Sequence, residues 1–200
     1  FPFAIPFWMM GPALIMGNTV VFKPAEQTAL VGERIMMLCE DAGFPPGVIN
    51  MVHGGGIPGE ALVRDPRVRL VLFTGSYEVG RKIKQICAQD DGLDKMLVAE
   101  TGSKSGLIVL SDADLALGSD ATYKSAFKTT GQRCVSAGRV FVPKEIVNSF
   151  VDVLMRDIEN NVREGDPLNP QTFMGPLVDE QGMKKVAFYN ELIREAASRE

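Results

Sequence analysis

The three cysteines are the candidate nucleophiles, and their sequence surroundings differ. Cys39 and Cys87 lie within helical patterns, where a cysteine is most simply a small buried hydrophobe. Cys134 instead follows a polar break at Thr129–Arg133 and precedes the small residues Ser136–Gly138. A cysteine in a turn of small residues beside a cation is typical of a reactive thiolate. We therefore expect Cys134 to act as a nucleophile.

A nucleophilic cysteine needs a base, and the sequence favours a carboxylate for that role. His53 is the only histidine, and we expect it to be a bystander rather than the partner of a Cys–His dyad. Glu100 follows the apolar run Lys95–Ala99 at the expected end of a strand. A carboxyl group buried at such a position is suited to activating water near neutral pH. The alternative is a structural glutamate that caps Lys104.

Three further segments could bind a nucleotide. Lys23 and Glu26 directly follow an apolar strand pattern and could face the hydroxyls of one ribose, or Glu26 could simply favour a helix start. Phe73–Gly80 combines a strand end, a glycine turn and the helix-capping Ser76, which would offer backbone N–H groups to a pyrophosphate. The alternative is a routine strand-to-helix link. Gly54–Gly56 allows close backbone approach, or is merely a flexible loop.

These residues must be positioned by alternating strands and helices. Strands are predicted at Thr19–Phe22, Val48–Val52, Leu70–Phe73, Lys95–Ala99, Leu107–Leu110 and Arg139–Val142, each an apolar run typical of burial on both faces. Helices are predicted between the first two strands, after Ser76, from about Ala113 to Gly131, from Glu145 to about Val162, and from about Asp179 to the C-terminus. This alternation predicts an α/β fold with a mostly parallel sheet and a boundary near Glu100–Ser105.

The composition excludes several classes of protein. Of the 200 residues, 46% are hydrophobic and 23% are charged, which excludes a disordered, collagen-like or disulfide-scaffold chain. The 21 Lys and Arg against 25 Asp and Glu give a net charge of −4, so nothing favours nucleic acid or an anionic membrane as partner. The cysteine and histidine spacing matches no zinc motif, and we expect no metal. Sparse, odd-numbered cysteines suit a reducing compartment, so we expect a cytoplasmic protein.

The first 16 residues are strongly apolar but do not fit a membrane segment. They contain Pro2, Pro6 and Pro12, lack a basic leader region, and fall short of the ~18 apolar residues that a spanning helix needs. We expect this stretch to be buried core.

Five segments, in family order, resemble motifs of the NAD(P)-dependent aldehyde dehydrogenase superfamily. They are Gly17–Thr28 (GNTVVxKPAEQT), Gly43–Asn50 (GxPPGVxN), Phe73–Gly80 (FTGSxxxG), Gly131–Cys134 (GQxC) and Met174–Leu177 (MGPL), the last preceded by Gly165–Pro167 and Thr172 as in GDPxxxxT. The family's ELGGK segment is Glu-Thr-Gly-Ser-Lys at 100–104, which keeps the carboxylate but not the Leu or the second Gly. The resemblance covers essentially the whole chain.

The resemblance implies a Rossmann-like parallel-sheet cofactor domain at residues 1–102, followed by the beginning of an α/β catalytic domain at 103–200. It implies that Cys134 forms a thiohemiacetal and then a thioester with an aldehyde, and that Glu100 activates the water that releases a carboxylic acid. The implied cofactor-binding residues are Lys23, Glu26, Gly56, Thr74, Gly75, Ser76, Val79, Gly80 and Thr101. The implied cofactor is NAD, with NADP as the alternative, because Glu26 would repel a 2′-phosphate. A small aldehyde substrate and a homo-oligomeric full-length protein are also implied.

The sequence leaves two alternative functions open. By resemblance the chain is the central portion of a longer enzyme, with the family's oxyanion-hole asparagine expected one residue before Phe1. The chain could then be a catalytically incomplete fragment that only binds nucleotide. It could also be a CoA-acylating relative, which passes the thioester to a thiol, although such relatives commonly lack a carboxylate at the position of Glu100.

Overall fold

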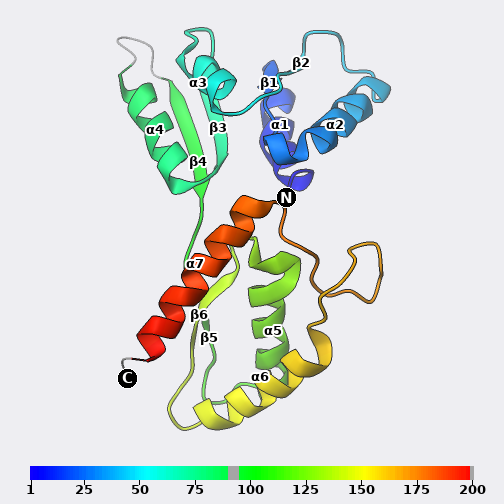
Figure 1. Cartoon of the computed structure of the whole chain (residues 1–200). Helices are drawn as coiled ribbons and strands as arrows, with labels where there is room; N and C mark the ends of the chain where they lie inside the picture. The colour runs from blue at the N-terminus through cyan, green and yellow to red at the C-terminus, as the bar shows by residue number, and fades with distance from the viewer. Residues whose placement is uncertain (90–94, 199–200) are drawn as a thin grey trace. The chain divides into compact units, whose positions relative to one another are not determined.

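The computed structural model describes residues 1–89 and 95–198, and the chain divides into two compact units, Phe1–Gly102 and Ser103–Glu200 (Figure 1). Both units alternate strands with helices. The described strands form three parallel pairs, β1 with β2, β3 with β4 and β5 with β6. The predicted α/β class with parallel sheets is therefore confirmed.

The first part of unit 1 is built around the β1–β2 pair. Its elements are α1 (Ala4–Ile15), β1 (Val20–Phe22), the short 3₁₀ helix η1 (Glu26–Thr28), α2 (Ala29–Asp41) and β2 (Ile49–Met51). Gly43, at φ +82°, terminates α2 in a conformation that favours glycine, and Pro45 and Pro46 follow. Met10, Ile35, Cys39 and Ile49 form a buried cluster that joins α1 and α2 to β2.

The second part of unit 1 contains the β3–β4 pair and, among the described residues, two helices. These elements are α3 (Gly56–Arg64), β3 (Leu70–Gly75), α4 (Tyr77–Ala88) and β4 (Met96–Thr101). The register runs from Leu70 opposite Met96 to Gly75 opposite Thr101, so both strands end at the same edge. Just before β4, the buried ammonium of Lys95 donates to the carbonyls of Val63 at 2.6 Å and Asp65 at 3.0 Å. Lys95 thereby satisfies carbonyls at the end of α3 and ties that helix to β4.

Unit 2 is built around the β5–β6 pair. Its elements are β5 (Ser105–Ile108), α5 (Leu115–Phe127), the one-turn segment η2 (Lys128–Gly131), β6 (Ala137–Phe141), α6 (Val147–Asn161) and α7 (Glu180–Ala197). Asp114 caps α5, because its carboxylate accepts from the Ala116 and Leu117 amides at 2.9 and 3.2 Å. The fully buried Ser119 hydroxyl donates to Asp157 at 2.6 Å and joins α5 to α6. The last two residues, which the α7 prediction included, lie outside the described residues.

The expected burial is wrong in several places. The prediction that residues 1–16 are buried core is wrong, because most of them form α1, in which Met10 is buried while Trp8 is 70% exposed. The prediction that the strands are buried on both faces is also wrong, since Val98 on β4 and Phe141 on β6 are exposed. Each ladder of the described residues has two strands, so every strand is an edge strand, and these side chains stay exposed within their own unit. Among the described residues, no helix combines the length and the apolarity needed to span a bilayer.

Candidate active site

Cys134 lies in the turn that leads from α5 to β6, and its side chain is exposed. Gly131 enters this turn at φ +64°, where an added Cβ would lie 2.9 Å from the Ala126 carbonyl oxygen. The Arg133 amide donates to the Gly131 carbonyl at 2.9 Å, and the Arg133 side chain donates from Nε to Thr129 Oγ1 at 2.8 Å. The turn therefore combines an accessible thiol with a guanidinium, carried by the preceding residue, that is held in place.

The other two cysteines are less accessible. Cys39 is 6% exposed within the core of unit 1, and burial raises the pKa of its thiol. Cys87 is half-buried on α4. The description of Cys39 as a buried hydrophobe is confirmed, and Cys134 is the exposed thiol among the three.

We expect Cys134 to be alkylated faster than Cys39 and Cys87, because a thiol must be both ionised and accessible to react. Brief exposure of the folded full-length protein to iodoacetamide, followed by peptide mapping, measures this order. Unfolded protein serves as the control, and there the three thiols should be labelled at similar rates. Faster labelling of Cys39 or Cys87 in the folded protein would contradict the assignment of Cys134.

Glu100 stands near the end of β4, opposite Thr74 on β3. Its side chain is exposed in unit 1, so the predicted burial of this carboxylate is wrong. Among the described strands β4 pairs only with β3, so it is an edge strand, and Glu100 stays exposed near its end. Glu100 belongs to unit 1 and Cys134 belongs to unit 2, so each residue is described by its surroundings within its own unit.

The start of α4 has the geometry of an anion-binding helix terminus. Ser76 is the N-cap, and its hydroxyl accepts from the Val79 amide at 3.3 Å. Gly80 lies so close to β4 that an added Cβ would come within 3.0 Å of Thr101 Cγ2. At Gly75 an added Cβ would meet the Phe73 ring at 2.6 Å. These small residues let the helix start approach the ends of β3 and β4, which brings Thr74, Gly75, Ser76, Gly80 and Thr101 together. Val79, on the same turn, is 44% exposed.

A second group gathers after β1 and β2. The Lys23 ammonium donates to the Pro24 carbonyl at 2.8 Å and to the Gly54 carbonyl at 2.9 Å. An added Cβ on Gly55 would lie 3.8 Å from Glu26 Oε1, so the exposed Glu26 carboxylate stands beside the glycine run. Gly56 begins α3 directly after that run. The structure therefore brings Lys23, Glu26 and Gly56 into one neighbourhood.

The link between Lys23 and Gly54 was not predicted from the sequence. Pairing of β1 with β2 could have signalled it, because Lys23 and the glycine run both follow the carboxyl ends of these strands. His53, beside the glycines, lies 3.5 Å from Glu33, measured from Nε2 to Oε1, with both side chains about half exposed. Within residues 1–89 and 95–198, no three His, Cys, Asp or Glu side chains are grouped to hold a metal ion.

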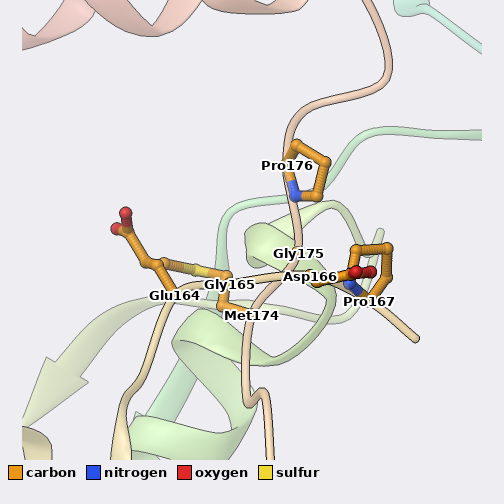
Figure 2. A pocket seen from close by; sticks show the side chains of 7 residues that line it. All are labelled: Glu164, Gly165, Asp166, Pro167, Met174, Gly175 and Pro176. Atoms are coloured by element: carbon orange, nitrogen blue, oxygen red, sulfur yellow. The ribbon is translucent and has the colours of Figure 1, made fainter. Parts of the chain in front are cut away.

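Unit 2 also contains a pocket of about 450 Å³ between two loop segments (Figure 2). Its lining residues are Glu164–Pro167 and Met174–Pro176. Figure 2 shows Glu164 on one side and Asp166 with Pro167 on the other. The Thr130 hydroxyl donates to the Gly175 carbonyl at 3.0 Å, which connects this pocket wall to the turn that carries Cys134. Sequence reasoning noted both segments as motifs but did not predict the pocket.

Comparison with known proteins gives consistent matches across the chain. Residues 1–199 match the aldehyde dehydrogenase family. Betaine aldehyde dehydrogenase from Cereibacter sphaeroides is 40% identical over 199 residues, which is 100% of this chain and 40% of that protein.

Solved structures agree with this match. Gamma-glutamyl-gamma-aminobutyraldehyde dehydrogenase from Burkholderia cenocepacia superposes with a TM-score of 0.90 at 37% identity, covering 96% of this chain and 38% of that one. An NADP-dependent enzyme from E. coli superposes with a TM-score of 0.84 at 36% identity, covering 90% of this chain and 37% of that one. The chain thus spans about 40% of the length of the curated relatives it matches. The chain belongs to the aldehyde dehydrogenase family.

Proposed function

We propose that the full-length protein oxidises an aldehyde to a carboxylic acid with NAD(P) as hydride acceptor. The exposed thiol of Cys134, on a turn that also holds the Arg133 guanidinium, is the observation that carries this proposal. The thiolate attacks the aldehyde carbonyl to form a thiohemiacetal, and the Cys134 backbone N–H stabilises its oxyanion. Loss of hydride from the same carbon leaves a thioester on Cys134.

The residues of unit 1 fit a dinucleotide. The capped start of α4 offers backbone N–H groups and the positive end of the helix dipole to a pyrophosphate. Lys23 uses two of its protons on Pro24 and Gly54, so one remains for a ribose hydroxyl, and the neighbouring Glu26 can accept from another. The exposed Val79 can pack against an adenine. When bound, the nicotinamide group supplies the acceptor for the hydride.

Glu100 completes the reaction by activating water. Its exposed carboxylate, at the edge where β3 and β4 end, can take a proton from water that attacks the thioester. This favours release of a carboxylic acid over transfer of the acyl group to CoA. We assign residues 1–102 to the cofactor domain and 103–200 to the catalytic domain. We further propose that the full-length protein is a homo-oligomer located in the cytoplasm.

The proposed activity is tested by aldehyde-dependent reduction of NAD and NADP in the full-length protein. Betaine aldehyde and gamma-glutamyl-gamma-aminobutyraldehyde, which give two of the similar proteins their names, are the first substrates to screen. We expect reduced cofactor, measured by its absorbance, and carboxylic acid to form in a 1:1 molar ratio. Turnover that requires CoA and yields an acyl-CoA would support the acylating alternative. Nucleotide binding without turnover across the aldehyde panel would support a protein that only binds nucleotide.

Replacing Glu26 with Gln is expected to weaken the binding of NAD and to leave the binding of NADP unchanged or stronger. The substitution removes a charged acceptor for the ribose and the repulsion of a 2′-phosphate. A hydrogen bond to a charged group contributes about 1.5–3 kcal/mol, so affinity for NAD should fall roughly tenfold or more. Titration calorimetry with both dinucleotides measures the change, and Glu40→Gln, on the exposed face of α2, is the matched control. Unchanged affinity for both dinucleotides would show that Glu26 does not contact the cofactor and only favours the start of a helix.

A further inference from the structure

The turn before Cys134 has an unusual backbone. Thr129 and Thr130 both adopt φ 58°, with ψ of 35° and 32°, and Gly131 follows at φ +64°. They are the only non-glycine residues with positive φ in the described ranges, 1–89 and 95–198. A β-branched residue in this left-handed region is a genuine outlier, and such residues persist where surrounding contacts determine the conformation. The contacts of these two threonines therefore matter.

Thr129 and Thr130 make different contacts. The Thr129 hydroxyl donates to the Lys128 carbonyl at 2.5 Å and accepts from Arg133, so its bonds stay within the turn. The Thr130 hydroxyl reaches 45 residues along the chain and donates to the Gly175 carbonyl at 3.0 Å, in a partly buried position. Thr130 thus anchors the turn to a different segment of unit 2.

The segment that carries Gly175 is itself fixed. The Phe173 and Met174 amides both donate to the Arg163 carbonyl at 3.0 Å, and the Gly165 amide donates to the Met174 carbonyl at 3.1 Å. The Phe173 ring packs against the buried Tyr123 of α5, with 5.7 Å between ring centroids. The Gly175 carbonyl is therefore presented from a loop that is tied both to itself and to α5.

We propose that Thr130 is a positioning residue for Cys134. Its hydrogen bond to the Gly175 carbonyl holds the left-handed turn, and the turn in turn fixes the direction of the thiol and of the Arg133 guanidinium. Thr130 acts through the backbone and does not touch the substrate. This inference rests on the proposed function, because it gives Thr130 a role in the reaction of Cys134.

Two substitutions in the full-length protein separate the hydroxyl from the shape of the side chain. Thr130→Val keeps the branch at Cβ and removes the donor, whereas Thr130→Ser keeps the donor and removes the branch. We expect Thr130→Val to slow NADH formation in the first turnover by about 10- to 100-fold, because small misplacements of a reacting group have effects of that size. The KM for NAD should not change, and Thr130→Ser should retain the first-turnover rate within about twofold of wild type.

Alkylation of Cys134 gives a second readout that needs no substrate. Loosening the turn moves the Arg133 guanidinium relative to the thiol, so Thr130→Val should lower the iodoacetamide rate at Cys134 by about fivefold, and Thr130→Ser should not. If Thr130→Val does not fold, Thr130→Ala removes the same donor without the branch and should give the same losses.

The outcomes distinguish this inference from the proposed function. A folded Thr130→Val or Thr130→Ala protein with wild-type alkylation and first-turnover rates would overturn the positioning role. Equal losses in Thr130→Ser would also overturn it, because the hydroxyl would then not be the cause. A wild-type protein that reduces neither NAD nor NADP with any aldehyde would remove the proposed function, while the alkylation rates would still decide whether Thr130 positions the thiol.

Discussion

Replacing Glu100 with Gln in the full-length protein is expected to stop the second half of the reaction while the first half continues. Gln cannot take a proton from water, so the thioester on Cys134 accumulates. General-base assistance is typically worth about 10²- to 10⁴-fold, and steady turnover should fall by that order. Rapid mixing with aldehyde and NAD should give a burst of NADH near one per active site, followed by a slow phase.

The burst distinguishes the roles open to Glu100. Loss of the burst together with turnover would mean that Glu100 acts before hydride transfer, for example by deprotonating Cys134. Full turnover in the variant would remove Glu100 from the mechanism. Glu145→Gln, which changes an exposed carboxylate in unit 2, is the matched control and should keep wild-type turnover.

Replacing Cys134 with Ala is expected to abolish NADH formation in both the first turnover and the steady state. Without the thiol no thiohemiacetal forms, and removal of a catalytic nucleophile costs on the order of 10⁴-fold or more. Affinity for NAD should be retained, because the proposed nucleotide-binding residues belong to unit 1. Stopped-flow absorbance and calorimetry measure the two quantities.

The control for this variant is Cys87→Ala, which changes the half-buried thiol of α4 and should retain most of the turnover. Substantial turnover in Cys134→Ala would contradict a covalent mechanism through this residue. Loss of NAD affinity in Cys134→Ala would show that the substitution disturbs more than the nucleophile.

The strands could be predicted closely from the sequence, because short apolar runs between turn residues carry a strong signal. Each of the six predicted strands overlaps an observed one, for example Leu70–Phe73 within β3 (Leu70–Gly75). Ser76 was identified as a cap from its place between a glycine turn and a helical pattern, and the structure shows its hydroxyl accepting from Val79. Local chemistry was sufficient for these features.

Two helices were not predicted, for different reasons. α1 (Ala4–Ile15) contains Pro6 and Pro12, which favour a break, and its apolar residues show no polar face that would reveal a helical period. α3 (Gly56–Arg64) begins inside a run of three glycines, which is typical of a loop. At the end of α3 the Val63 carbonyl accepts a hydrogen bond from the distant Lys95, a contact that sequence periodicity does not encode.

Long-range contacts account for what the sequence did not predict in the candidate site. Sequence alone disfavours a left-handed backbone at Thr129 and Thr130, and the contact that accompanies it is a hydrogen bond to Gly175, 45 residues away. The bond from Lys23 to the Gly54 carbonyl likewise depends on the pairing of β1 with β2. Burial of Glu100 was inferred from its strand end, but burial depends on the layers around that strand.

Mass spectrometry of the trapped intermediate tests the central claim, that Cys134 carries the substrate covalently, most directly. The Glu100→Gln protein is mixed with aldehyde and NAD, quenched in acid during the slow phase, and digested for peptide mapping. The peptide that contains Cys134 should gain the mass of the aldehyde less two hydrogens, as expected for a thioester, in an amount equal to the NADH burst. An unmodified Cys134 peptide alongside a full burst, or the same adduct on Cys39 or Cys87, would contradict the mechanism.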